Sequence, residues 1–122
     1  MLELDALIEE KVYGRVCPEE RTDENMIGWE KQSDGTYILY SYNPEVRVFY
    51  ISDVWPRKYS ENILLAWNLV VKYTISVLPV VTDKGEIVEW NARSNKLPNF
   101  TTTGVTAAEA ICILVAEIIK NE

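Results

Sequence analysis

The chain lacks histidine altogether and has only two cysteines among its 122 residues. The absence of histidine excludes Ser-His and Cys-His nucleophile pairs, an imidazole general base, and every zinc or iron site that contains histidine. Cys17 and Cys112 form no CxxC pair, whereas a secreted domain of this size usually carries four cysteines or more. We therefore expect a reducing cytoplasm, with Cys112 in the core and the Cys17 thiol partly exposed.

Motifs for catalysis and metal binding are missing too. The sequence contains no GxGxxG, P-loop or HExxH motif and no calcium-loop spacing. Its carboxylate pairs, such as Glu9 and Glu10, are typical of solvated surface. The alternative is a metal site made of oxygen donors alone, and its candidate ligands are Asp23, Glu24 and Asn25. We expect no enzyme activity, hence no catalytic residue, no metal and no cofactor.

Neither membrane insertion nor direct nucleic-acid binding is expected. The acidic start lacks the basic and apolar regions of a signal peptide, and no window of 18 uncharged apolar residues is present. Twelve basic residues against 19 acidic ones give a net charge of −7, which repels phosphate backbones. Residues 1–30 contain nine of the acidic residues. They form either a solvated face around the first helix and the loop after it, or an acidic surface that mimics a nucleic acid or binds a basic partner.

Apolar residues make up 48% of the chain, enough for one core, so we predict a single domain over residues 1–122. Periodicity and turn signals predict the element order α-β-β-β-α-β-β-α. This order indicates the α+β class and a three-layer α-β-α sandwich, with a mainly antiparallel sheet between helical layers. The predicted helices cover residues 2–13, 61–73 and 107–120, and the predicted strands cover residues 27–31, 36–42, 46–51, 75–81 and 86–90.

Capping signals predict where the later helices begin. Ser60 is expected to cap the second helix, and Thr106 with Glu109 forms a capping box before the third. Within the second helix, the apolar residues recur at helical spacing, which predicts one buried face. The residues of that face are Ile63, Leu64, Trp67, Val70 and Val71.

Turn signals separate the strands. The Asp34-Gly35 pair predicts a hairpin between the first two strands. Pro79, inside the fourth predicted strand, indicates an edge strand or a bulge. Residues 53–59 and 91–100 break the strand pattern and are predicted to be loops.

Three blocks of sequence lie near the beginning, the middle and the end of the chain. They are residues 4–14, residues 59–67 with a Tyr-Ser start and an Ala-Trp pair, and residues 106–112 with an Ala-Ile-Cys run. In this order they resemble the phage ABA-sandwich domain family, which residues 15–58 match least. The resemblance implies a phage or prophage protein of a Gram-positive host, with a helix–sheet–helix sandwich and no active site to carry over. It also implies that Trp67 is a core anchor.

The predicted loop at residues 53–59 is the candidate ligand-binding element. Its candidate site residues are Trp55, Arg57, Lys58 and Tyr59. The two cations could hold a phosphate while the two rings stack on a base, as a nucleotide-like ligand requires. In the alternative interpretation the rings fasten the loop to the core and the cations face water. Two further cations would join the cluster if the fold brought them close, namely Arg93 and Lys96.

Aromatic residues on the second and third predicted strands offer another surface. These residues are Tyr37, Tyr40, Tyr42, Phe49 and Tyr50. If exposed, they favour a protein interface or a homodimer. In the alternative interpretation, helices cover the sheet on both sides.

Taken together, these features favour a non-enzymatic accessory protein that acts by binding in the host cytoplasm. Its partner is either a host or phage protein or a small nucleotide-like ligand, which the protein would sequester as an oligomer. The alternative is a structural module that self-assembles into a homo-oligomer and holds no ligand.

Overall fold

The computed structural model describes residues 2–20 and 28–122, and it shows a mixed α+β fold. The predicted order of helices and hairpins is confirmed, with one additional strand, β6, in residues 101–104, for which no element was predicted. The elements are α1 (Leu2–Lys11), a 3-10 turn η1 (Pro18–Glu20), β1 (Trp29–Lys31), β2 (Tyr37–Asn43), β3 (Val48–Trp55), α2 (Ile63–Tyr73), β4 (Ile75–Val81), β5 (Ile87–Ser94), β6 (Thr101–Gly104) and α3 (Ala107–Lys120).

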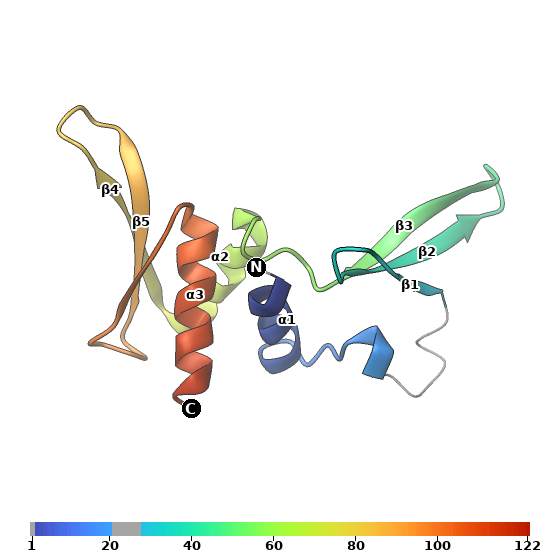
Figure 1. Cartoon of the computed structure of the whole chain (residues 1–122), viewed down its shortest axis with the longest axis horizontal. Helices are drawn as coiled ribbons and strands as arrows, with labels where there is room; N and C mark the ends of the chain where they lie inside the picture. Colours follow the sequence, from blue (N-terminus) through green and yellow to red (C-terminus); the bar gives the residue numbers. More distant parts are fainter. Residues whose placement is uncertain (1, 21–27) are drawn as a thin grey trace.

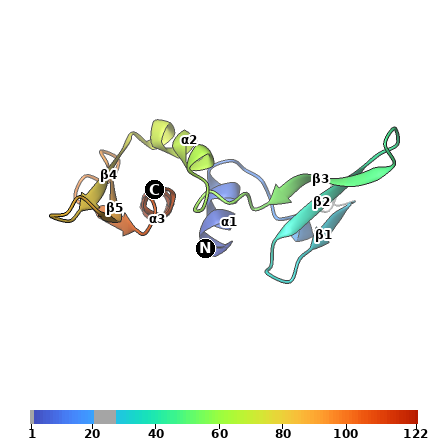
Figure 2. The same ribbon diagram turned by 90° about the horizontal axis from the view of Figure 1, so that it is seen from above.

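The strands form two separate antiparallel sheets, in the orders β1-β2-β3 and β4-β5-β6. The sheets lie at opposite ends of the molecule, and the three helices lie between them (Figures 1 and 2). The three-layer sandwich with one central sheet is therefore not confirmed within a single chain. Hairpin signals specify which strands are neighbours in a pair, but they carry no information on whether two hairpins join one sheet.

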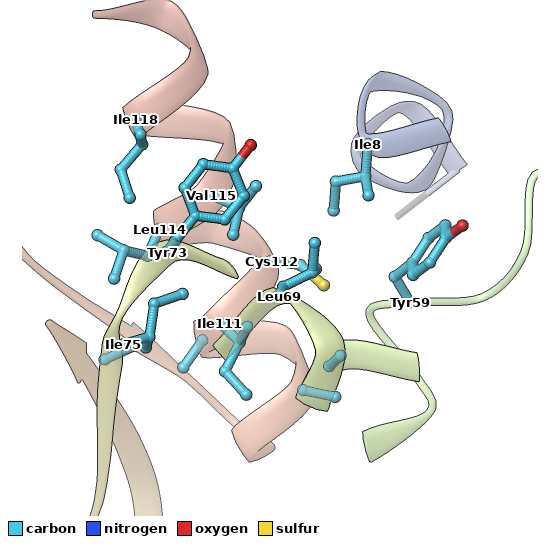
Figure 3. Packing of buried hydrophobic residues seen from close by; sticks show 14 residues of the cluster. Ile8, Tyr59, Leu69, Tyr73, Ile75, Ile111, Cys112, Leu114, Val115 and Ile118 are labelled. Carbon is cyan, nitrogen blue, oxygen red and sulfur yellow. The ribbon is translucent and has the colours of Figure 1, made fainter. Parts of the chain in front are cut away.

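The hydrophobic core surrounds α3, whose apolar side chains meet α1, α2 and the second sheet (Figure 3). The predicted core position of Cys112 is confirmed, and burial raises the pKa of its thiol. The start of α3 is capped as expected, because the Thr106 hydroxyl accepts a hydrogen bond from the Glu109 amide at 3.1 Å. The largest fully buried side chains of the core cluster are Ile8, Tyr59, Leu69, Ile111, Leu114, Val115 and Cys112.

Helix α2 differs from the prediction in its cap and in its buried face. The N-cap is Asn62, whose side-chain oxygen accepts hydrogen bonds from two amides of the first turn, and not Ser60. The buried side chains are Ala66, Leu69 and Tyr73, and of the predicted face only Val70 packs against the core. The predicted core anchor Trp67 is instead 56% exposed, because the opposite side of the helix packs on α3.

The second sheet positions β6 against the start of α3. Strand β5 continues to Ser94, so residues 91–94 are strand and not loop. The buried Thr102 hydroxyl of β6 donates to the Ala110 carbonyl at 2.8 Å, and Gly104 approaches the α3 backbone so closely that a Cβ would lie 2.6 Å from the Ala110 nitrogen. The prediction for Pro79 is confirmed, because β4 is an edge strand.

The first sheet extends further than predicted at its end nearest the helices. Strand β3 includes residues 53–55, which were predicted to be loop, and Trp55 pairs with Tyr37. The hairpin at Asp34-Gly35 is confirmed: Gly35 has φ +90°, and the Asp34 carboxylate accepts hydrogen bonds from the Thr36 amide and hydroxyl. In the described part of the chain, no helix has the length and apolar character needed to cross a bilayer.

Candidate functional site

Residues 55–59 connect the first sheet to α2, and both candidate aromatic rings are buried there. The Trp55 side chain is 5% exposed, and its indole nitrogen donates to the Arg15 carbonyl at 2.9 Å. The Tyr59 side chain is 1% exposed, and its hydroxyl donates to the carboxylate of Glu9. Neither ring therefore presents a face on which a base could stack.

The carboxylate of Glu9 holds this segment against α1. It is fully buried, and Arg15 Nη1 and Arg57 Nη2 donate to it at 2.8 and 2.9 Å. The Arg57 amide also donates to Glu9 Oε2 at 3.1 Å. Arg15 uses its other terminal nitrogen to bind Asp53 of β3 at 2.8 Å. A buried carboxylate must be matched by hydrogen-bond donors of opposite charge, and here one arginine follows α1 while the other lies 48 positions away.

Arg57 lies beside two aromatic rings as well as against Glu9. The rings of Tyr13 and Tyr59 stack with centroids 5.4 Å apart, and the Arg57 guanidinium lies 5.2 and 5.3 Å from them. Burial tends to lower the pKa of Arg57, but the hydrogen bonds and charge of Glu9 outweigh it and raise that pKa. Burial and the bond to Glu9 raise the pKa of the Tyr59 hydroxyl. The positive charge of Arg57 is thus already matched by a carboxylate.

Lys58 points away from this network. Its amine is exposed and lies 3.8 Å from the Glu61 carboxylate. It borders a hollow of about 270 Å³ whose lining also includes Asp5, Asp34 and Glu61, so carboxylates outnumber the cation there. A phosphate would meet like charges at this rim.

Of the two further cations, Arg93 lies on β5 and lines a separate hollow of about 460 Å³ beside β4. Figure 1 shows β5 across α3 from residues 55–59. The structure therefore brings Trp55, Arg57 and Tyr59 together around Glu9, while Lys58 lies outside that network and Arg93 in the other sheet. Lys96, two residues after β5, is exposed.

The sequence analysis missed two buried acids in α1. Glu9, expected on solvated surface, is internal, and Asp5 accepts hydrogen bonds from the Ser60 amide at 2.8 Å and the Ser60 hydroxyl at 3.0 Å. Burial raises the pKa of Asp5, against the opposing effect of the Ser60 hydrogen bonds. The signal was present in the spacing, because Asp5 and Glu9 share the helix face of Ile8 and Val12. The candidate oxygen donors at residues 23–25 lie outside the described residues.

Helix α2 carries a second apolar face that no part of its own described chain covers. Four large side chains at helical spacing point away from α3, and Leu64 is 79% exposed and Val71 73% exposed. A helix that is apolar nearly all round is normally buried. We call these four residues the α2 face: Ile63, Leu64, Trp67 and Val71.

The distal half of the β2–β3 hairpin also exposes an apolar face. Its register places Tyr42 opposite Phe49 and Tyr40 opposite Ile51, and directly opposite residues share a face of the sheet. The Tyr42 and Phe49 rings are in contact, with centroids 4.9 Å apart. We call residues 40–51 the arm, and its apolar face consists of Tyr40, Tyr42, Phe49 and Ile51.

The opposite face of the arm is more polar. The Ser41 and Ser52 hydroxyls are hydrogen-bonded there at 2.8 Å, beside Tyr50. Of the five aromatic residues noted on the second and third predicted strands, only Tyr37 is buried, and the other four lie on the exposed arm. Among the described residues, no helix covers this part of the sheet (Figures 1 and 2).

Comparisons with protein-family models, with curated proteins and with solved structures find no match to this chain.

Proposed function

We propose that this chain is a non-enzymatic accessory protein that acts by binding another protein through the α2 face. The three blocks that resemble the phage ABA-sandwich family support a phage or prophage origin, with the host cytoplasm as the place of action. The partner is a host protein, a phage protein or a second copy of the chain. No step of this function requires a metal or a cofactor.

The observation that carries the proposal is the exposure of α2. Typical monomers expose scattered apolar residues, and large contiguous patches mark interaction sites. On α2 the exposed residues form one continuous face around Trp67, the residue type most enriched at the energetic centre of protein interfaces. The only polar side chains among residues 63–72 are Asn68 and Lys72.

Sequestration of a small nucleotide-like ligand at residues 55–59 ranks second. Such a ligand would have to displace Glu9 from Arg57 and expose the buried rings of Trp55 and Tyr59. Lys58 remains the accessible cation for it. Extra mass of a few hundred daltons on the native protein, lost on denaturation and weakened by Lys58→Glu but not by Lys72→Glu, would favour this function.

Affinity capture from a bacterial lysate tests the proposal. Leu64→Glu places a charge on the α2 face, and Val105→Glu places one at a matched position, 75% exposed, outside it. We expect the wild type and Val105→Glu to retain the same stoichiometric protein partner and Leu64→Glu to lose it. Retention of that partner by Leu64→Glu would contradict the proposal, and so would a wild type that captures no protein and is also monomeric.

Self-association would also reconcile the fold with the expected sandwich. In the described ranges 2–20 and 28–122, no helical layer lies over the arm and no sheet lies over the outer face of α2. A second copy would supply both missing layers, and the three-layer α-β-α arrangement would then belong to the assembly.

A further inference from the structure

We infer that two copies of this chain form a symmetric dimer in which the arm of each copy docks on the α2 face of the other. The inference rests on the proposed function and identifies the partner as a second copy. In both views the arm projects away from the helices of its own chain, so it does not cover its own α2 (Figures 1 and 2). One chain therefore exposes two apolar faces, and these can pack against each other only when they belong to different molecules.

The arm has the features of a hairpin that is stabilised by packing against another surface. Among the described residues, the ladder beyond Tyr40 consists of β2 and β3 alone, because β1 pairs with residues 37–39. A two-stranded ribbon is marginally stable by itself in water. One face of the arm carries large apolar side chains throughout, whereas the other mixes Val48 and Tyr50 with polar Ser41 and Asn43, so the first face is the better match for an apolar surface.

The arm face fits within the length of the α2 face. From Ile63 to Val71 the α2 face spans about 12 Å at 1.5 Å per residue. Along each arm strand the apolar face covers two residue steps, Tyr40 to Tyr42 and Phe49 to Ile51, or about 7 Å at 3.3 Å per residue. Each face presents four large side chains and no charge within it, so neither partner would bury an unpaired ion.

The rims of the faces supply charges of both signs. The arm tip carries Glu45 and Arg47, and the α2 face is flanked by Glu61 and Lys72. Either orientation of the arm along the helix therefore allows opposite charges to meet at the solvated rim, where they set register more than affinity.

The exposed area suits a dimer. Fully exposed aromatic side chains offer about 150–250 Å² each, so the eight partly exposed side chains leave on the order of 1,000 Å² of apolar surface per chain. Divided between the two separate faces, this is about 500 Å² each, the size of the largest and often functional patch of a typical monomer. In a two-fold dimer each copy donates one arm and accepts one, so the assembly is closed and contains two equivalent contacts. Together these two contacts are large enough for an interface of about 1,600 Å².

Sedimentation velocity on the purified full chain tests the inference with two matched pairs of variants. Tyr42→Glu charges the apolar face of the arm, and Tyr50→Glu charges its opposite face at nearly equal exposure, 50% against 51%. Val71→Glu charges the α2 face, and Val105→Glu is its equally exposed control. We expect a dimeric wild type, dimeric controls, and at least a 100-fold weaker dimer for Tyr42→Glu and for Val71→Glu. Circular dichroism verifies that every variant is folded.

A mixing experiment tests which face meets which. When Tyr42→Glu and Val71→Glu are combined, the intact arm of Val71→Glu can dock on the intact α2 face of Tyr42→Glu. We expect a heterodimer that is stronger than either homodimer, detected with a size tag on one variant. An arm-to-arm or helix-to-helix interface would yield no such rescue and would overturn the inference.

A monomeric wild type, or a dimer that survives either Tyr42→Glu or Val71→Glu, would overturn it as well. The proposed function fails separately, by the capture experiment. A monomeric protein that still captures a partner through Leu64 would retain the proposed function and exclude the dimer.

Discussion

At the scale of single residues, Glu9 determines how α1, the Arg57 segment and β3 are held together. Its buried carboxylate binds Arg15 and Arg57, and Arg15 also binds Asp53 of β3. These ion pairs link the helices to the first sheet. That Glu9 faces inward follows from its spacing with Asp5 and Val12 on the helix face that carries Ile8. Its partner Arg57 lies 48 positions away, and no local pattern in the sequence indicates that pairing.

Replacing Glu9 tests this connection. Glu9→Gln removes the negative charge while Arg15 and Arg57 stay in place, and we expect unfolding free energy to fall by about 2–4 kcal/mol, because both arginines retain some access to water. The exposed neighbour Glu10→Gln is the control and should change stability by less than about 0.5 kcal/mol. Urea unfolding measures both, and equal effects of the two substitutions would show that the network does not stabilise the fold.

Asp5 gives the fold a specific pH dependence. Its pKa is raised in the folded state above the ordinary 3.8, so the folded protein binds this proton more readily than the unfolded chain. Stability contributed by this group is therefore lost as pH rises above 3.8, through the raised pKa. The side chain of Asp5→Asn does not titrate. We therefore expect the unfolding free energy of the wild type to fall relative to that of Asp5→Asn as pH rises through this range. A difference that is constant with pH, or that shrinks, would contradict this assignment.

At the scale of elements, α2 shows what sequence periodicity cannot decide. The helix is apolar on two sides, so its spacing fits burial of Leu64 and Trp67 as well as burial of Leu69 and Tyr73. Contact with α3 selects the second set. Strand β6 was missed for a related reason, since the threonines of residues 101–103 carry no strong apolar signal and are held by their contact with α3.

Two substitutions in α2 separate its faces. Leu69→Ala should lower the unfolding free energy by about 2–5 kcal/mol, because it leaves a cavity beside α3. Trp67→Ala should cost about 1 kcal/mol or less in the monomer, since its side chain is more than half exposed. Both are measured by urea unfolding in a Phe49→Glu background, which removes any contribution from docking of the arm. A larger loss for Trp67→Ala than for Leu69→Ala would show that the faces are reversed.

At the scale of the whole molecule, two small sheets lie on either side of a helical centre, and large apolar side chains remain outside. The α+β class and the hairpins could be predicted, because turns and periodicity are local. The division into two sheets could not, because it depends on which surfaces α1 and α3 present to distant strands. The exposed arm follows from that division, since a single continuous sheet would have placed it under a helical layer.

Native mass spectrometry of the gently purified wild type tests most directly the claim that the chain acts through protein contacts. We predict an assembly at twice the 14.0 kDa chain mass, or a complex with one other protein, that carries no small molecule. Loss of that assembly in Leu64→Glu, but not in Val105→Glu, would assign it to the α2 face. A bare monomer, or a protein with an additional few hundred daltons that is lost on denaturation, would contradict the account.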